Sequence, residues 1–254
     1  RHPEDIVPLF NTMSGAHHLD PWSRREIKTM SPPVSPAGAV QGKRALFIPA
    51  LGGNIADAQY QAIVEKGLAK LSDLGLDIDV ALDDPTQFQP DIATQMMTSN
   101  LAARVRQMSV EAQQHLGPGL QSLLGEEEFK SDGVRLQTDA IDRSRTYDRL
   151  ERVLSNYDFV LTPTLTAPPP LADPNSDQSV TINGNKERIN KWWTHLSIAN
   201  LTGHPAISIP CGIDANDLPV GLHAIGGWDR DSDLVSLAFA SITCFDWTER
   251  RPVY

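Results

Sequence analysis

Two hydrophobic periodicities alternate along the chain and predict a succession of helices and strands. Positions 57–74 carry apolar residues at the spacing of one helix face, and short apolar runs flank them at 44–49 and 76–82. Gly75 follows the predicted helix and ends it. A strand, a helix and a second strand in this order form a right-handed crossover with parallel strands. This segment therefore predicts an α/β fold.

The remaining elements follow from the same patterns. Helical spacing predicts further helices over 3–13, 91–116, 131–156, 189–201 and from Asp231, which we expect to cap the last of them. Short apolar runs predict strands at 157–161, 206–209 and 220–225. Pro- and Ser-rich residues at 20–41, and polar residues from Pro168 to about Arg188, predict irregular connections.

Composition narrows the class of protein. The 254 residues are 40% hydrophobic and 21% charged, which is typical of a globular protein. Lys and Arg total 22 against 32 Asp and Glu, and this net charge of -10 repels phosphate backbones and anionic lipids. We therefore expect neither nucleic acid nor a membrane as a partner. Two widely separated cysteines and the lack of a long apolar run favour a reducing, cytoplasmic setting.

Four blocks of sequence carry a family resemblance. They are RHPEDIVPLFNTMSGAHHLDPWS at 1–23, YDFVLTPT at 157–164, NLTGHPAISIPCG at 200–212 and LPVGLHAIG at 218–226. With these blocks in this order, the chain resembles the amidase signature family, serine-dependent hydrolases and transferases of carboxamides. The resemblance implies a mixed central sheet flanked by helices. It also implies cleavage of an amide C–N bond through an acyl-enzyme, with no metal or cofactor.

The catalytic residues that the resemblance implies have no counterpart in this sequence. The family uses a Ser–cis-Ser–Lys triad, and its serine lies in a Gly/Ser-rich segment that precedes the block at 1–23. Acyl transfer needs backbone donors beside the nucleophile, and no Gly/Ser cluster that could supply them occurs here. We therefore expect the C-terminal part of an amidase, with no catalytic residue in this chain and little activity by itself.

This interpretation divides the chain into three parts. Residues 1–42 form a helix and a Pro-rich connection, and residues 43–156 form the crossover and a helical region on the substrate side of the enzyme. Residues 157–254 complete the sheet. The chain opens at Arg1 without a methionine, so we expect its natural start to lie upstream. The upstream segment could be a separate chain, could have been removed, or could be lost in a catalytically dead relative.

The expected partners are a small-molecule amide substrate and the upstream catalytic segment. A sheet cut beside its catalytic segment leaves an unpaired strand edge and exposed apolar surface. We therefore expect tight association with that segment, or homodimers or aggregates without it.

Substrate-binding candidates lie just before the third block: Trp192, Trp193 and His195. The resemblance implies that relatives using glutamine for tRNA amidation carry an acidic residue at about the position of Trp193. An indole cannot pair with the amine of glutamine, so Trp193 favours a hydrophobic or aromatic acyl group. Simple packing of both tryptophans is the alternative.

Two other functions remain open at this point. Cys211 could act as a thiol nucleophile with His204, His195 or His223 as its base, although its place at the end of an apolar strand favours a buried structural role. A non-catalytic binding or assembly subunit on the same fold is the second alternative, because a fold does not determine a function.

Overall fold

The computed structural model describes residues 2–23, 29–117, 133–170 and 179–245. Its strands are β1 (Arg44–Phe47), β2 (Asp77–Val80), β3 (Phe159–Pro163), β4 (Ser179–Ile182), β5 (Asn185–Arg188), β6 (Ala206–Ile213) and β7 (Pro219–Gly226). Its α-helices are α1 (Ile6–Met13), α2 (Ala58–Asp73), α3 (Pro90–Val105), α4 (Val110–Gln114), α6 (Gly133–Leu154), α7 (Ser197–Thr202) and α8 (Asp231–Cys244). Short 3-10 turns are η1 (Pro3–Asp5), η2 (Leu51–Gly53), η4 (Ile189–Trp192) and η5 (Thr194–Leu196).

A mixed five-stranded sheet in the order β2-β1-β3-β7-β6 forms the centre of the molecule. β1 pairs in parallel with β2 and with β3, which confirms the predicted crossover. β7 runs antiparallel to both β3 and β6. The expected α/β fold with a mixed sheet is therefore confirmed, and β2 and β6 are its edge strands.

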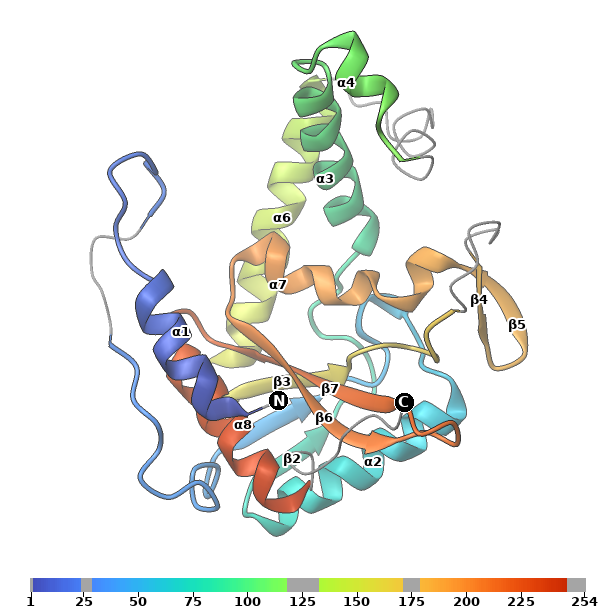
Figure 1. Cartoon of the computed structure of the whole chain (residues 1–254). Helices are drawn as coiled ribbons and strands as arrows, with labels where there is room; N and C mark the ends of the chain where they lie inside the picture. Colours follow the sequence, from blue (N-terminus) through green and yellow to red (C-terminus); the bar gives the residue numbers. More distant parts are fainter. Residues whose placement is uncertain (1, 24–28, 118–132, 171–178, 246–254) are drawn as a thin grey trace.

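Helices cover both faces of this sheet (Figure 1). On one face α2 and α8 contribute Val64, Leu71 and Leu237 to a core shared with Phe47 and Leu161. A second core on the other face joins α3, α6 and α7 to the sheet, with these residues at its centre: Ile92, Leu150, Ile198, Ile48 and Val160. Alternate residues of β3 thus enter opposite cores, as the period of a strand requires.

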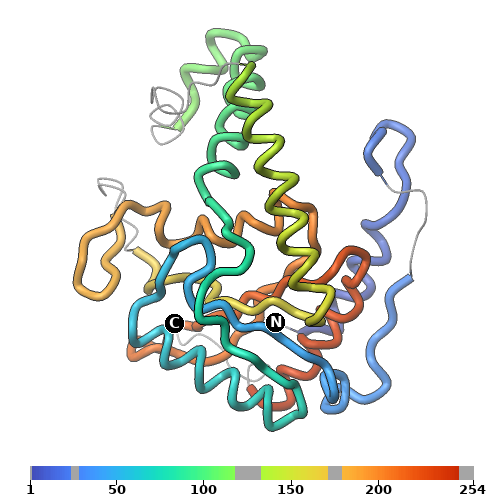
Figure 2. The backbone as a smooth tube through the Cα atoms, turned by 180° about the vertical axis from the view of Figure 1, so that it is seen from behind, coloured from blue at the N-terminus to red at the C-terminus, as the bar shows by residue number. Residues whose placement is uncertain are grey.

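Two long helices project from the sheet as an arm. α3 and α6 lie side by side and run away from the strands in both views (Figures 1 and 2). At the other end of the molecule α1 packs against α8 through Val7, Val235 and Phe239. In the described parts of the chain, no helix is long and apolar enough to cross a bilayer.

The single helix predicted over 91–116 is wrong, because the structure has α3, a turn and α4 there. Ser109 starts the new helix, since its side chain accepts a hydrogen bond from the backbone N–H of Ala112. The Gln113 amide donates to the carbonyl oxygens of Val105 and Met108 and so satisfies the end of α3. Local capping therefore ends the first helix and starts the second, although the helical spacing of apolar residues continues.

The region between β3 and β6 also differs from its prediction. The helix predicted over 189–201 is divided into η4, η5 and α7, and α7 ends at Gly203, which adopts a left-handed conformation with φ of 77°. Part of the expected polar loop is a hairpin of β4 and β5, with Asn183 and Gly184 at its turn in positive φ. Asp231 does not cap α8, because the cap position is Arg230 and Asp231 lies in the first turn.

The packing of α2 on β6 depends on a helical glycine. A Cβ atom at Gly67 would lie 2.8 Å from Cβ of Cys211 and 3.2 Å from its backbone oxygen. We predict that Gly67→Ala lowers the free energy of unfolding by roughly 1–3 kcal/mol, because β6 must move away from the helix. Urea denaturation measures the change.

Gly117→Ala is the matched control, since a Cβ there meets nothing within 4 Å. Its effect should stay within about 0.5 kcal/mol. Equal stability of the two variants would contradict the close approach of α2 to β6.

Candidate active-site edge

The carboxyl end of β3 carries a hydroxyl pair that faces open space. After Pro163 the chain turns, and the N–H of Thr164 donates to the carbonyl oxygen of Gly221 on β7. Oγ1 of Thr164 lies 2.7 Å from Oγ of Ser208 on β6. Neither hydroxyl is bonded to an amine or an imidazole in the described part of the chain. The pair therefore lacks, among these residues, the base that a nucleophilic hydroxyl needs.

Gly221 allows these two hydroxyls to approach each other. A Cβ atom at this position would lie 2.7 Å from Oγ1 of Thr164 and 2.9 Å from Oγ of Ser208. Ile209 and Cys211 of β6 point into the core under α2 and α8, whereas Ala206 and Ser208 are exposed on the opposite face. This face of β6 is therefore open beside the polar end of β3.

Two buried histidines lie behind the hydroxyl pair. His195 donates from Nε2 to the carbonyl oxygen of Pro163 at 2.8 Å, which leaves Nδ1 to accept from the Asn54 amide at 3.4 Å. His223 lies opposite Thr162 and Ser208 in the sheet register, and its Nδ1 has no hydrogen-bond partner in the described residues. Burial lowers the pKa of both rings, to about 3 for His223, where the neighbouring His195 adds a smaller effect.

The structure places the three predicted substrate-binding residues in different surroundings. Trp192 packs on the hairpin of β4 and β5, and its indole donates to the carbonyl oxygen of Ala167 at 2.8 Å. His195 is buried beneath Pro163. Trp193 lies between η4 and η5 and lines a pocket. Trp193 is thus the one of the three that lines this pocket.

That pocket lies between α3, α6 and α7 and has a volume of about 590 Å³, within the range of small-molecule sites. Trp193, Trp228, Met96 and Met97 form much of its apolar lining. Arg143 of α6 adds a cation. Such a pocket suits a ligand with a sizeable apolar or aromatic group.

The structure gives the cysteine alternative no support. Cys211 is 3% exposed, and its Sγ donates to the carbonyl oxygen of Val220 at 3.4 Å. Burial raises the pKa of this thiol to about 12, so the reactive thiolate is scarce at neutral pH. Cys211 fills the core between α2 and β6. No cluster of three metal-ligating side chains occurs in the described ranges.

Comparison with known proteins decides the family. The family model for amidase matches residues 1–235. The chain belongs to the amidase signature family. A glutamyl-tRNA(Gln) amidotransferase subunit from Bacillus thuringiensis (strain Al Hakam) is 32% identical over 102 residues, which are 40% of this chain and 19% of that protein.

Solved amidase structures share the fold of this chain. A bacterial aryl acylamidase of the amidase signature family matches 100% of this chain with a TM-score of 0.80 at 20% identity. The corresponding glutamyl-tRNA(Gln) amidotransferase subunit from Thermotoga maritima matches 93% with a TM-score of 0.69, also at 20% identity. The matches cover 55% and 49% of those two chains, so this chain spans about half the length of its structural relatives.

The buried histidines should make stability depend on pH. The pKa of His223 is about 3 in the folded amidase chain and close to 6.5 when the chain unfolds, so the unfolded state binds the extra proton between these values. The free energy of unfolding should therefore fall as the pH drops below about 6.5, with His223 contributing up to about 1.4 kcal/mol per pH unit. Urea titrations at pH 6, 5 and 4 measure the slope.

His223→Gln removes the titrating ring and should flatten this slope. His115→Gln changes an exposed residue at the end of α4 and should keep the slope of the unmodified protein. An unchanged slope in the His223 variant would contradict a neutral buried imidazole.

Proposed function

We propose that this chain is the substrate-shaping part of an amide hydrolase. The complete enzyme would convert a carboxamide to a carboxylate and ammonia or an amine through an acyl-enzyme. The nucleophilic serine and the lysine that moves its proton would come from an upstream segment. The observation that carries the proposal is that the whole length of this chain matches only 55% of the length of an amidase. In addition, the hydroxyl pair of Thr164 and Ser208 has no activating base among the described residues.

The open face of β6 offers a place for that segment. β6 is an edge strand, so its outer backbone groups have no neighbouring strand in the described sheet. Its exposed Ser208 lies beside Thr164, and Ala206 is exposed on the same face of the strand. A strand and loop of the upstream segment would pair with this edge and bring the catalytic serine beside the hydroxyl pair. This arrangement is what supports the proposed association with an upstream segment.

The chemistry divides between the two parts. The upstream serine would attack the amide carbonyl carbon, and backbone N–H groups beside it would stabilise the oxyanion. The C–N bond then breaks, the leaving nitrogen takes a proton, and water hydrolyses the resulting ester. This chain would hold the acyl group and exclude water from it. His195 and Trp192 would position the turn that presents Trp193, since both are held by carbonyl oxygens of the strand and loop before it.

The Trp193 pocket favours an apolar or aromatic acyl group. Two tryptophans and two methionines line it, and Trp193 stands where glutamine-dependent relatives are expected to carry an acid. Among the structural relatives, the one named as an aryl acylamidase matches the full chain. We therefore propose an aromatic or other bulky amide as the substrate in preference to glutamine.

Trp193→Ala should change selectivity in the complete enzyme. Loss of the indole removes apolar contact area from the acyl group, so kcat/KM for phenylacetamide should fall about tenfold or more relative to that for acetamide. The ratio of the two kcat/KM values is the measurement, because it cancels differences in the fraction of folded enzyme.

Trp22→Ala is the control, since Trp22 is 91% exposed and lies outside the pocket. Its selectivity should equal that of the unmodified enzyme. A folded Trp193 variant with unchanged selectivity would refute the acyl-binding role of Trp193.

A further inference from the structure

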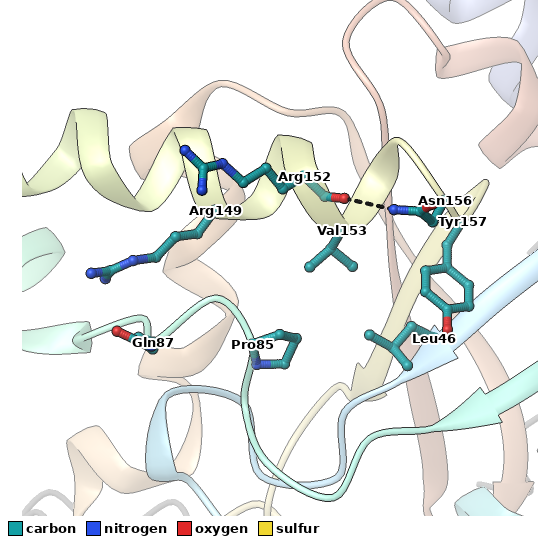
Figure 3. A pocket seen from close by; sticks show the side chains of 8 residues that line it. All are labelled: Leu46, Pro85, Gln87, Arg149, Arg152, Val153, Asn156 and Tyr157. Carbon is teal, nitrogen blue, oxygen red and sulfur yellow. Dashed lines mark hydrogen bonds between the residues drawn. The ribbon is translucent and has the colours of Figure 1, made fainter.

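A second cleft lies away from the Trp193 pocket and shares none of its lining residues. It has a volume of about 450 Å³ and lies between the C-terminal half of α6 and the loop that follows β2. Figure 3 shows its side chains: Leu46, Pro85, Gln87, Arg149, Arg152, Val153, Asn156 and Tyr157. The size is that of a site for a small organic molecule.

Two guanidinium groups project over one end of this cleft. Both side chains extend from α6 toward the same end of the cleft, with the guanidinium of Arg149 above Gln87 and that of Arg152 level with the helix (Figure 3). Neither guanidinium has a carboxylate partner in the described part of the chain, whereas Arg135 and Arg145 of the same helix pair with Asp139 and Asp142. In a chain with a net charge of -10, these two arginines on one turn of α6 place two cations beside the cleft, without a direct ion-pair partner among the described residues.

Two carboxylates beside the cleft, those of Asp84 and Asp79, have hydrogen-bond partners of their own. Asp84, beside Pro85, accepts from the N–H and Oγ1 of Thr86 and from the N–H of Gly52. Asp79 accepts from Arg44 and from the hydroxyl of Tyr157. Neither acid is bonded to Arg149 or Arg152.

The floor of the cleft is apolar, and its wall includes Gln87, whose backbone has a positive φ. Val153, Leu46 and Pro85 form the floor between the arginines and Tyr157 (Figure 3). Gln87 adopts a positive φ of 48°, and the turn made by Asp84 and Thr86 precedes it. Its amide thereby stands below the guanidinium of Arg149, where it can donate a hydrogen bond to the same head group of a ligand.

We propose that this cleft binds a small organic anion, with a phosphate or carboxylate head group between Arg149 and Arg152 and a compact apolar body against Val153, Leu46 and Pro85. Guanidinium groups match both head groups through charge-assisted paired hydrogen bonds. The apolar floor then gives an organic anion a higher affinity than an inorganic one. The site is independent of the proposed amide hydrolysis.

Calorimetric titration of the protein with phenyl phosphate and with benzoate tests the proposal. At least one of them should bind saturably in low salt. It should bind more tightly than inorganic phosphate, which lacks the apolar body, and more tightly than benzyl alcohol, which lacks the charge. Arg149→Gln/Arg152→Gln should weaken the binding about tenfold or more for each guanidinium lost. Added NaCl should weaken it as well.

Arg104→Gln/Arg106→Gln is the matched control, because it removes the same charge from exposed positions at the end of α3. Its affinity should equal that of the unmodified protein, and thermal unfolding of both double variants verifies their fold. Equal affinity of the two double variants, or no saturable binding of either probe, would overturn the proposal. Tighter binding of phenyl phosphate than of benzoate would assign a phosphate ester, and the reverse order a carboxylic acid.

Discussion

β3 is buried along its whole length because it pairs with β1 on one side and with β7 on the other. It is also the strand at which the sheet changes from parallel to antiparallel pairing. Leu161 enters the core under α2 and α8, while Val160 enters the core under α6 and α7. The carboxylate of Asp158, just before the strand, accepts from the N–H of Arg44 and from the Lys43 ammonium. Both layers of helices are therefore fixed relative to one strand.

This constraint explains why polar groups gather where β3 ends. Thr162 and Thr164 lie at the carboxyl end of the same strand that anchors the two cores. Ser208 of β6 and His223 of β7 lie beside them. Their backbone pairing makes the arrangement rigid, yet no described residue activates the hydroxyls as a base. Under the function proposed above, these residues would orient the acyl group and a neighbouring segment, and another part of the enzyme would supply the nucleophile.

The sequence predicted the fold where one local rule was sufficient. The crossover at 44–82 and the strands β6 and β7 followed from the period of the apolar residues and from flanking glycines. The helix from Asp231 followed from its apolar spacing, although Asp231 is not its cap. The hairpin of β4 and β5 was missed although Asn183 and Gly184 form the dipeptide typical of a tight hairpin turn. Asp57 fixes that hairpin by accepting from the N–H of Asn183, a contact across 126 positions that no local pattern contains. For the same reason, the sequence could not separate the roles of Trp192, whose indole donates to the carbonyl oxygen of Ala167, and Trp193, which lines the pocket.

The division of labour between this chain and an upstream catalytic segment is the central claim. Intact-mass analysis after treatment with a fluorophosphonate probe tests it most directly, on the 254-residue chain alone and on the same chain co-expressed with the segment encoded upstream of it. We predict that the lone chain keeps its mass and that the label appears on the upstream segment. Labelling of the lone chain, which would reveal an activated serine within it, would contradict this division.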